Sequence, residues 1–218
     1  MSNENKARRE ILQTAFNTLN GVFTYASAYG YPTVDSFIDF LGQKTISDSG
    51  SGYGGLAISA RLLDLPCSIY GTNVQFGCRS FLQEQAVIVR AQANNLVDRP
   101  VSQEELVVAI DQANKRTVDQ FAHETLFPDN FFDDGFDLNG PYLYIPLNGK
   151  ELFYKTIANY YRTLKRGGSY SIFTTTADRE GIGSEKLAML EQFGAEVGFR
   201  GKRILDEQNK LLGYKLIK

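Results

Sequence analysis

The run TISDSGSGYGG, residues 45–55, contains the residue types best suited to binding a ligand. Its acidic residue, Asp48, is followed by glycines at alternate positions, which are Gly50, Gly52 and Gly54. Because glycine has no side chain, such a turn lets the backbone come very close to a ligand. An apolar stretch follows, so the pattern predicts a strand, a tight turn and a helix that together bind a nucleotide-like molecule.

Metal chemistry has few candidate ligands in this chain. There are two cysteines, Cys67 and Cys78, and a single histidine, His123. A zinc site needs three or four such ligands, so we expect no metal site. Four aspartates gather in residues 129–137, but their spacing does not match a calcium loop. We interpret that segment as a solvated acidic turn.

Composition and charge describe an ordinary globular chain of 218 residues. Its 23 Lys and Arg against 25 Asp and Glu give a net charge of -2, which disfavours nucleic acid as a partner. Residues 1–9 are polar and do not read as a signal peptide, and no apolar run is long enough to span a membrane. Two isolated cysteines are typical of a reducing compartment, so we expect a cytoplasmic protein.

Hydrophobic periodicity and turn residues predict the elements that position the glycine turn. We expect helices over residues 11–23, 34–41, 56–65, 81–94, 102–116, 150–164 and 184–193. We expect strands over residues 44–47, 67–71, 117–122, 142–147, 169–175, 196–205 and 211–217, with residues 25–32 as a loop and 127–139 as turns. Thr33 and Ser102 are expected N-caps.

Alternation of strands and helices predicts an α/β fold. We expect a doubly wound, mostly parallel seven-stranded sheet that ends in an antiparallel C-terminal strand pair. Residues 1–43 are expected to form an N-terminal helical extension, and residues 44–218 the α/β domain.

The ordered motifs resemble those of class I S-adenosylmethionine-dependent methyltransferases, a Rossmann-like superfamily. The run Asp48-x-Gly50-x-Gly52-x-Gly54 looks like that family's acidic glycine motif. Residues 164–172, LKRGGSYSI, are similar to the family's LKPGG step before the fifth strand. The final pair of strands also fits. Asn73 departs from the pattern, because the family usually has Asp or Glu after the second strand.

The resemblance implies S-adenosylmethionine as cofactor and assigns residues to it. The implied cofactor contacts are Asp48, Gly50, Ser51, Gly52, Gly54, Asn73 and Glu124. Asp48 would accept a hydrogen bond from the ammonium of the methionine moiety, and Glu124 would contact the adenine. Asn73 would contact the ribose, although an amide accepts at one end and donates at the other, unlike a carboxylate.

The acceptor side of the site is less well marked. Tyr142, Tyr144 and Asn148 are expected near the end of the fourth strand, where open α/β sheets bind ligands. His123 is a weak candidate for a catalytic base, and no residue stands out as a decisive one. The family's habit of covering its pocket with N-terminal helices implies that Tyr25, Tyr29 and Tyr31 form a lid. The acceptor would be a small molecule or a protein side chain. The sequence does not indicate an oligomeric state.

Two alternatives to a methyltransferase remain open. Gly50, Gly52 and Gly55 also match GxGxxG, the glycine pattern of NAD(P)-binding oxidoreductases. The substitution of Asn73 for a carboxylate leaves room for a non-catalytic protein that keeps the methyltransferase fold as a binding or scaffold module.

Overall fold

The computed structural model describes residues 19–73, 96–118, 120–138, 140–174 and 183–218. The helix expected over residues 81–94 lies outside the described residues, as does most of the one expected over residues 11–23.

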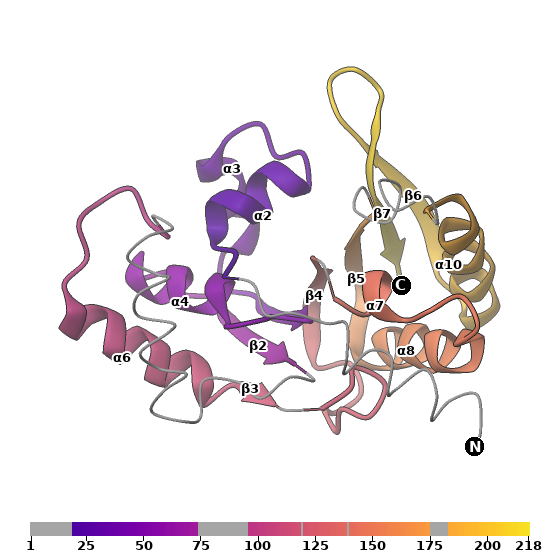
Figure 1. Ribbon diagram of the computed structural model, residues 1–218, viewed down its shortest axis with the longest axis horizontal. Coiled ribbons are helices and arrows are strands. Elements are labelled where there is room, and N and C mark those ends of the chain that lie inside the picture. The colour runs from indigo at the N-terminus through magenta and orange to yellow at the C-terminus, as the bar shows by residue number, and fades with distance from the viewer. Residues whose placement is uncertain (1–18, 74–95, 119, 139, 175–182) are drawn as a thin grey trace.

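The described helices and strands mostly alternate along the chain, with β6 and β7 in succession at the end (Figure 1). The helices are α2 (Val22–Ala28), α3 (Val34–Leu41), α4 (Gly55–Leu62), α6 (Gln103–Asn114), α7 (Pro141–Tyr144), α8 (Lys150–Thr163) and α10 (Gly183–Val197). The strands are β1 (Thr45–Ser49), β2 (Ser68–Thr72), β3 (Thr117–Val118), β4 (Phe132–Asp137), β5 (Leu164–Phe173), β6 (Arg200–Leu205) and β7 (Leu211–Ile217).

The strands form one sheet in the order β3-β2-β1-β4-β5-β7-β6. Strands β1 to β5 pair in parallel, and β7 runs antiparallel to both β5 and β6. This confirms the predicted mostly parallel, seven-stranded α/β sheet with an antiparallel C-terminal pair. The connections reverse direction between β1 and β4, which is the position where open α/β sheets bind ligands.

Two buried clusters cover the two faces of the sheet. One packs α2, α3, α4 and α6 against Ile46, Ile69 and Phe136. The other packs α7, α8 and α10 against strand residues that include Tyr170 and Ile172. Figure 1 shows α4 and α6 at one side of the view and α8 and α10 at the other. The paired strands β1 and β4, at the middle of the sheet, therefore lie between two groups of helices.

Helix caps form where the sequence predicts them. The Thr33 side chain accepts a hydrogen bond from the Ser36 backbone N–H at 3.1 Å, and Ser102 does the same for Glu105 at 3.2 Å. In both cases the side chain three residues on bonds back to the cap, which completes a capping box. These caps stabilise the first turns of α3 and α6.

The prediction of the fourth strand is wrong. Residues 142–147 do not form a strand; residues 141–144 form the short helix α7, with Pro141 at its first turn, where a missing N–H costs nothing. The strand is β4, in the segment expected to be turns. Glycine is needed at position 135, because a Cβ there would overlap the Tyr170 ring.

The acidic turn predicted over residues 129–137 is also wrong, because most of its aspartates belong to β4. Asp133 accepts a hydrogen bond from Thr45 N at 2.8 Å, and Asp134 accepts one from Ser169 N at 3.0 Å. Asp134 also pairs with Lys44 at 2.9 Å. Strands rich in Asp are rare on propensity alone, but here neighbouring elements satisfy the carboxylates.

Other boundaries differ by a few residues. The loop expected over residues 25–32 begins only after α2, which continues to Ala28, and residues 19–21 are not helical. Strand β1 extends to Ser49, so Asp48 lies inside the strand rather than after it. Strand β3 has two residues, and β6 begins at Arg200.

Candidate functional site

The glycine turn after β1 has the backbone conformation that its composition predicts. Gly50, Gly52 and Gly54 have φ values of 69°, 56° and 73°, in the left-handed region that side chains disfavour. The Ser51 backbone N–H donates to Thr72 O at 3.0 Å, which ties the turn to the end of β2. Ser51 is buried and its hydroxyl faces the same carbonyl at 3.4 Å.

The turn also packs directly against the loop after β4. A Cβ placed on Gly50 would overlap the Cα of Gly140, and a Cβ on Gly140 would overlap the carbonyl oxygen of Ser49. Two backbones therefore touch at the switch point between β1 and β4. Gly50 is required by this internal contact as well as by its positive φ.

Asp48 is a wholly buried carboxylate, with 0% of its surface exposed. Its Oδ1 accepts a hydrogen bond from the Tyr25 hydroxyl at 2.5 Å, whereas its buried Oδ2 has no hydrogen-bond partner among the described residues. Burial raises the pKa of Asp48 to about 7; the bond from Tyr25 opposes this shift, and the nearby Asp137 adds to it. An unsatisfied buried carboxylate oxygen is costly, so this position is suited to a cation or hydrogen-bond donor.

Asp137 is a second buried carboxylate, and sequence analysis did not single it out as a site residue. It pairs in register with Ser49, whereas Asp48 pairs with Phe136, so the two carboxylates point to opposite faces of the sheet. Asp137 accepts hydrogen bonds from the Gly140 and Tyr142 backbone N–H groups, each at 2.9 Å. Burial raises its pKa to about 7, against the effect of these bonds.

Asn73 lies at the end of β2, next to the glycine turn. Its Nδ2 donates a hydrogen bond to the Gly52 carbonyl at 2.9 Å. A carboxylate could not donate this bond, because an ionised Asp only accepts. The residue that departs from the methyltransferase pattern therefore has a structural role in holding the turn.

The three acceptor-side candidates lie in and after α7, at the end of β4. Tyr142 is 1% exposed, and its ring packs against Phe153 with centroids 6.1 Å apart. Tyr144 is half-buried, and Asn148 is exposed in the turn before α8. Tyr142 therefore contributes to the core, and the Tyr144 hydroxyl oxygen is also buried, so Asn148 is the most accessible of the three.

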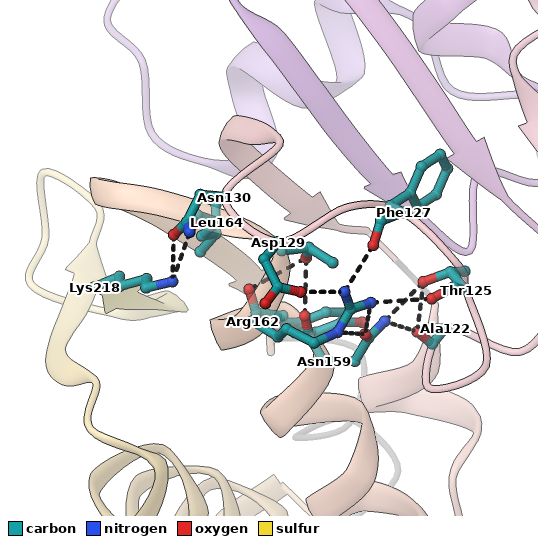
Figure 2. A network of polar contacts seen from close by, with 11 residues as sticks. Ala122, Thr125, Phe127, Asp129, Asn130, Asn159, Arg162, Leu164 and Lys218 are labelled. Atoms are coloured by element: carbon teal, nitrogen blue, oxygen red, sulfur yellow. Dashed lines mark hydrogen bonds and ion pairs between the residues drawn. The ribbon is translucent and has the colours of Figure 1, made fainter.

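His123 and Glu124 lie in the loop between β3 and β4. Figure 2 shows Asn159 of α8 bound to Ala122 and Thr125, the residues on either side of them. Asn159 Nδ2 donates to Ala122 O at 2.5 Å and to Thr125 Oγ1 at 2.7 Å. His123 is nearly buried and Glu124 is 42% exposed in its side chain, with 3.8 Å between His123 Nε2 and Glu124 Oε1. The residue expected beside adenine thus has an accessible carboxylate on an anchored loop.

Arg162, also in α8, binds the same loop. We call Asn159, Arg162 and the loop atoms that they bind the α8 clamp. The Arg162 guanidinium donates to Phe127 O and Asp129 Oδ1, both at 2.7 Å, and to Thr125 O at 3.2 Å (Figure 2). Two further bonds go to Asn159 Oδ1. The planar fork of arginine suits such a multiple contact.

The structure thus brings together part of the predicted site. Asp48, the glycine turn and Asn73 lie at adjoining strand ends, as expected. Sequence analysis missed Asp137 and Gly140, although an Asp-x-x-Gly step after a buried strand would have marked them. Within the described ranges, no group of three or more His, Cys, Asp or Glu is placed to hold a metal ion. No helix in the same ranges has the length and apolarity to cross a membrane.

Comparison with solved structures identifies the fold. No protein-family model and no curated protein sequence matches the chain. A protein of Methanococcus maripaludis, assigned as an S-adenosyl-L-methionine-dependent methyltransferase, superposes with a TM-score of 0.53 at 18% identity, covering 100% of this chain and 93% of the other.

Two further structures superpose less closely. The YcgJ protein from Bacillus subtilis has a TM-score of 0.49 at 11% identity, covering 83% of this chain and 95% of the other. Geranyl diphosphate C-methyltransferase from Streptomyces coelicolor has a TM-score of 0.45 at 13% identity, covering 100% and 97%. The strand order and the first superposition agree: the chain has the Rossmann-like fold of class I S-adenosylmethionine-dependent methyltransferases.

Proposed function

We propose that this chain binds S-adenosylmethionine at the β1–β4 switch point and transfers its methyl group to a small-molecule or protein acceptor. One observation carries the proposal. Asp48 Oδ2 is wholly buried beside a glycine turn and lacks a hydrogen-bond partner among the described residues. The ammonium of a methionine moiety would supply both the missing donor and the missing positive charge.

The remaining cofactor contacts in this proposal come from the strand ends around Asp48. The backbone of Gly50, Ser51, Gly52 and Gly54 would line the methionine and ribose. Asn73, whose Nδ2 donates to Gly52 O at the edge of the glycine turn, would contact the ribose. Glu124, on the loop held by the α8 clamp, would contact the adenine amino group.

The cofactor supplies an activated methyl on a sulfonium, so the protein mainly has to align an acceptor with it and exclude water. Orientation of that kind can lower a barrier by about 7–11 kcal/mol. Tyr142, Tyr144 and Asn148 are the proposed acceptor-side residues, with His123 as the weakest candidate for a base. Of these, Asn148 is exposed, whereas the hydroxyl oxygens of Tyr142 and Tyr144 are buried.

The N-terminal extension, residues 1–43, is proposed to cover the cofactor. Its described part supports this through two contacts of α2: Tyr25 donates to Asp48, and the Val22 backbone N–H donates to Ser59 Oγ at 3.0 Å. Both contacts hold α2 over the start of the glycine turn and α4. A cytoplasmic location is proposed from cysteine usage, since Cys67 is a buried free thiol.

A thermal-shift panel with S-adenosylmethionine, S-adenosylhomocysteine, NAD⁺ and NADP⁺ tests the proposal. A ligand at 100 times its Kd stabilises the native state by about 2.7 kcal/mol. We expect the first two ligands to raise Tm and the nucleotides to leave it unchanged. Gly52→Arg, which puts a large side chain on a residue with φ of 56°, should abolish the response. A rise in Tm with NAD⁺ alone would support an oxidoreductase. An unchanged Tm with all four ligands would support a scaffold role.

A further inference from the structure

The short helix α7 is bound at both ends by buried charged side chains from two different elements. At its start, the Asp137 carboxylate, from β4, accepts the backbone N–H groups of Gly140 and Tyr142 at 2.9 Å each. At its end, the Lys186 ammonium, from α10, donates to Tyr142 O at 2.9 Å and to Leu143 O. A helix of four residues has little stability of its own, so these side chains determine where α7 lies.

Lys186 is an unusual residue for this position. Only 2% of its surface is exposed, although lysine is almost never fully buried in proteins. The ammonium lies 5.9 Å from the centre of the Tyr142 ring, and its charge also acts on Asp137. A buried ammonium costs several kcal/mol unless it is well paired. A simple apolar contact between α10 and α7 would avoid that cost.

The position of α7 bears directly on the glycine turn. Gly140 immediately precedes α7, and its backbone contacts Gly50 and Ser49 so closely that neither glycine has room for a Cβ. A displacement of α7 would therefore be transmitted to the turn that starts at Gly50. Lys186 binds the Tyr142 and Leu143 carbonyls, two and three residues after Gly140.

We propose that Lys186 is a positioning residue that fixes α7 and, through the contact of Gly140 with Gly50, holds the glycine turn in its ligand-binding conformation. The inference rests on the proposed cofactor site. It assigns to α10 a role in cofactor affinity, although α10 itself contributes none of the proposed contacts. The charge of Lys186 is part of that role, because it faces the carboxylate that caps the other end of α7.

Two variants separate the hydrogen bonds of Lys186 from its charge. Lys186→Met removes both, whereas Lys186→Gln removes the charge and retains an N–H donor for the α7 carbonyls. Lys155→Met is the matched control, because Lys155 is a partly exposed lysine of α8 whose ammonium pairs with Glu151 at 3.0 Å. Titration calorimetry with S-adenosylhomocysteine from pH 5.5 to 8.5 measures affinity, and hydrogen exchange measures protection of the Tyr142 amide.

We expect Lys186→Met to weaken S-adenosylhomocysteine by about tenfold at pH 7 and to speed exchange at Tyr142, with the control unchanged. Affinity should fall as the pH is lowered and Asp137 is protonated, and in both Lys186 variants this fall should begin at a higher pH. The reason is that the ammonium lowers the pKa of Asp137, so removing it raises that pKa. The other titratable groups that interact electrostatically with Asp137 are Asp48, Tyr25, Tyr29, Tyr160 and Tyr170. If Lys186 only contributed to folding, its replacement would not change the pH dependence of S-adenosylhomocysteine affinity.

The outcomes distinguish this inference from the function on which it rests. If the wild-type protein does not bind S-adenosylhomocysteine, the proposed function is wrong. If the wild type binds and Lys186→Gln keeps both the wild-type affinity and the wild-type pH profile, the role assigned to Lys186 is wrong. Because Lys186→Gln retains a donor, it gives this answer even where Lys186→Met does not fold.

Discussion

The Tyr25 hydroxyl in α2 donates a 2.5 Å hydrogen bond to Oδ1 of Asp48 in β1, and both side chains are buried. Burial, together with the negative charge of Asp48, raises the pKa of Tyr25 well above its usual value, so the tyrosine remains the donor. This bond joins the N-terminal extension to the carboxylate that we propose as the ammonium acceptor. Oδ1 of Asp48 thus joins β1 to α2, and we propose that Oδ2 binds the ligand.

The stability of the ligand-free protein should fall as the pH rises from about 5 to 8. Burial holds the pKa of Asp48 at about 7, above the 3.8 of an exposed aspartate, so the native state binds this proton more tightly than the unfolded state does. Its contribution to stability is complete below about pH 4 and is lost as the pH rises through 7. Asp137 acts in the same direction. Urea denaturation across this range measures the change, which should be on the order of a few kcal/mol.

Asp48→Asn should reduce this pH dependence, because an amide does not ionise. We expect the variant to be more stable than the wild type at pH 8 and similar to it at pH 5. A variant equally destabilised at both pH values would show that ionised Asp48 carries no net cost in the ligand-free protein.

Gly50→Ala should destabilise the fold strongly, by more than about 3 kcal/mol, because its Cβ would overlap the backbone of Gly140. Gly167→Ala is the matched control. Gly167 also has a positive φ, 82°, but its Cβ would meet open space, so only the backbone strain of about 1–2 kcal/mol applies. Equal losses for the two variants in urea denaturation would contradict the close contact of Gly50 with Gly140.

Asn73→Asp restores the carboxylate typical of the methyltransferase pattern, yet we expect it to harm the site. The new carboxylate could not donate to Gly52 O, and it would place a negative charge against that carbonyl. The loss should be about 1–3 kcal/mol in stability, with no gain in S-adenosylhomocysteine affinity. Tighter binding by this variant would mean that ribose recognition outweighs the bond to the glycine turn.

Asn159→Ala should release the loop that carries Glu124, because it leaves Ala122 O and Thr125 Oγ1 without the Asn159 amide as donor. We expect a loss of about 1–3 kcal/mol and faster hydrogen exchange in residues 121–125. Gln192→Ala removes an exposed amide bond to Glu196 and should cost less than about 0.5 kcal/mol. If exchange in residues 121–125 is unchanged in Asn159→Ala, the α8 clamp does not hold this loop.

The sequence predicted the architecture well where local signals agree with the fold. The alternation of helices and strands, the helix caps at Thr33 and Ser102 and the glycine turn each have a local physical cause, and the structure has all of them. Asp48 was identified for the same reason, since it lies two residues before the first of the glycines.

The rest depended on contacts between segments far apart in the chain. Phe132–Asp137 looks like a turn because Asp and Gly are poor strand formers. Its aspartates are satisfied by other segments, among them Lys44, Lys165 and Ser169 for Asp133 and Asp134. Nothing near Asn73 in sequence shows that its amide holds Gly52. Lys186 likewise looks like an ordinary surface lysine of an amphipathic helix until α7 is placed beside it.

Titration calorimetry with S-adenosylhomocysteine at pH 7.5, on the wild type and on Asp48→Asn, tests the proposed cofactor site most directly. Asp39→Asn, at an exposed aspartate of α3, is the control. We predict binding in the micromolar range by the wild type and the control, and at least about tenfold weaker binding by Asp48→Asn. No binding by the wild type, or equal affinity in all three proteins, would contradict the assignment of Asp48 as the acceptor for the cofactor's ammonium.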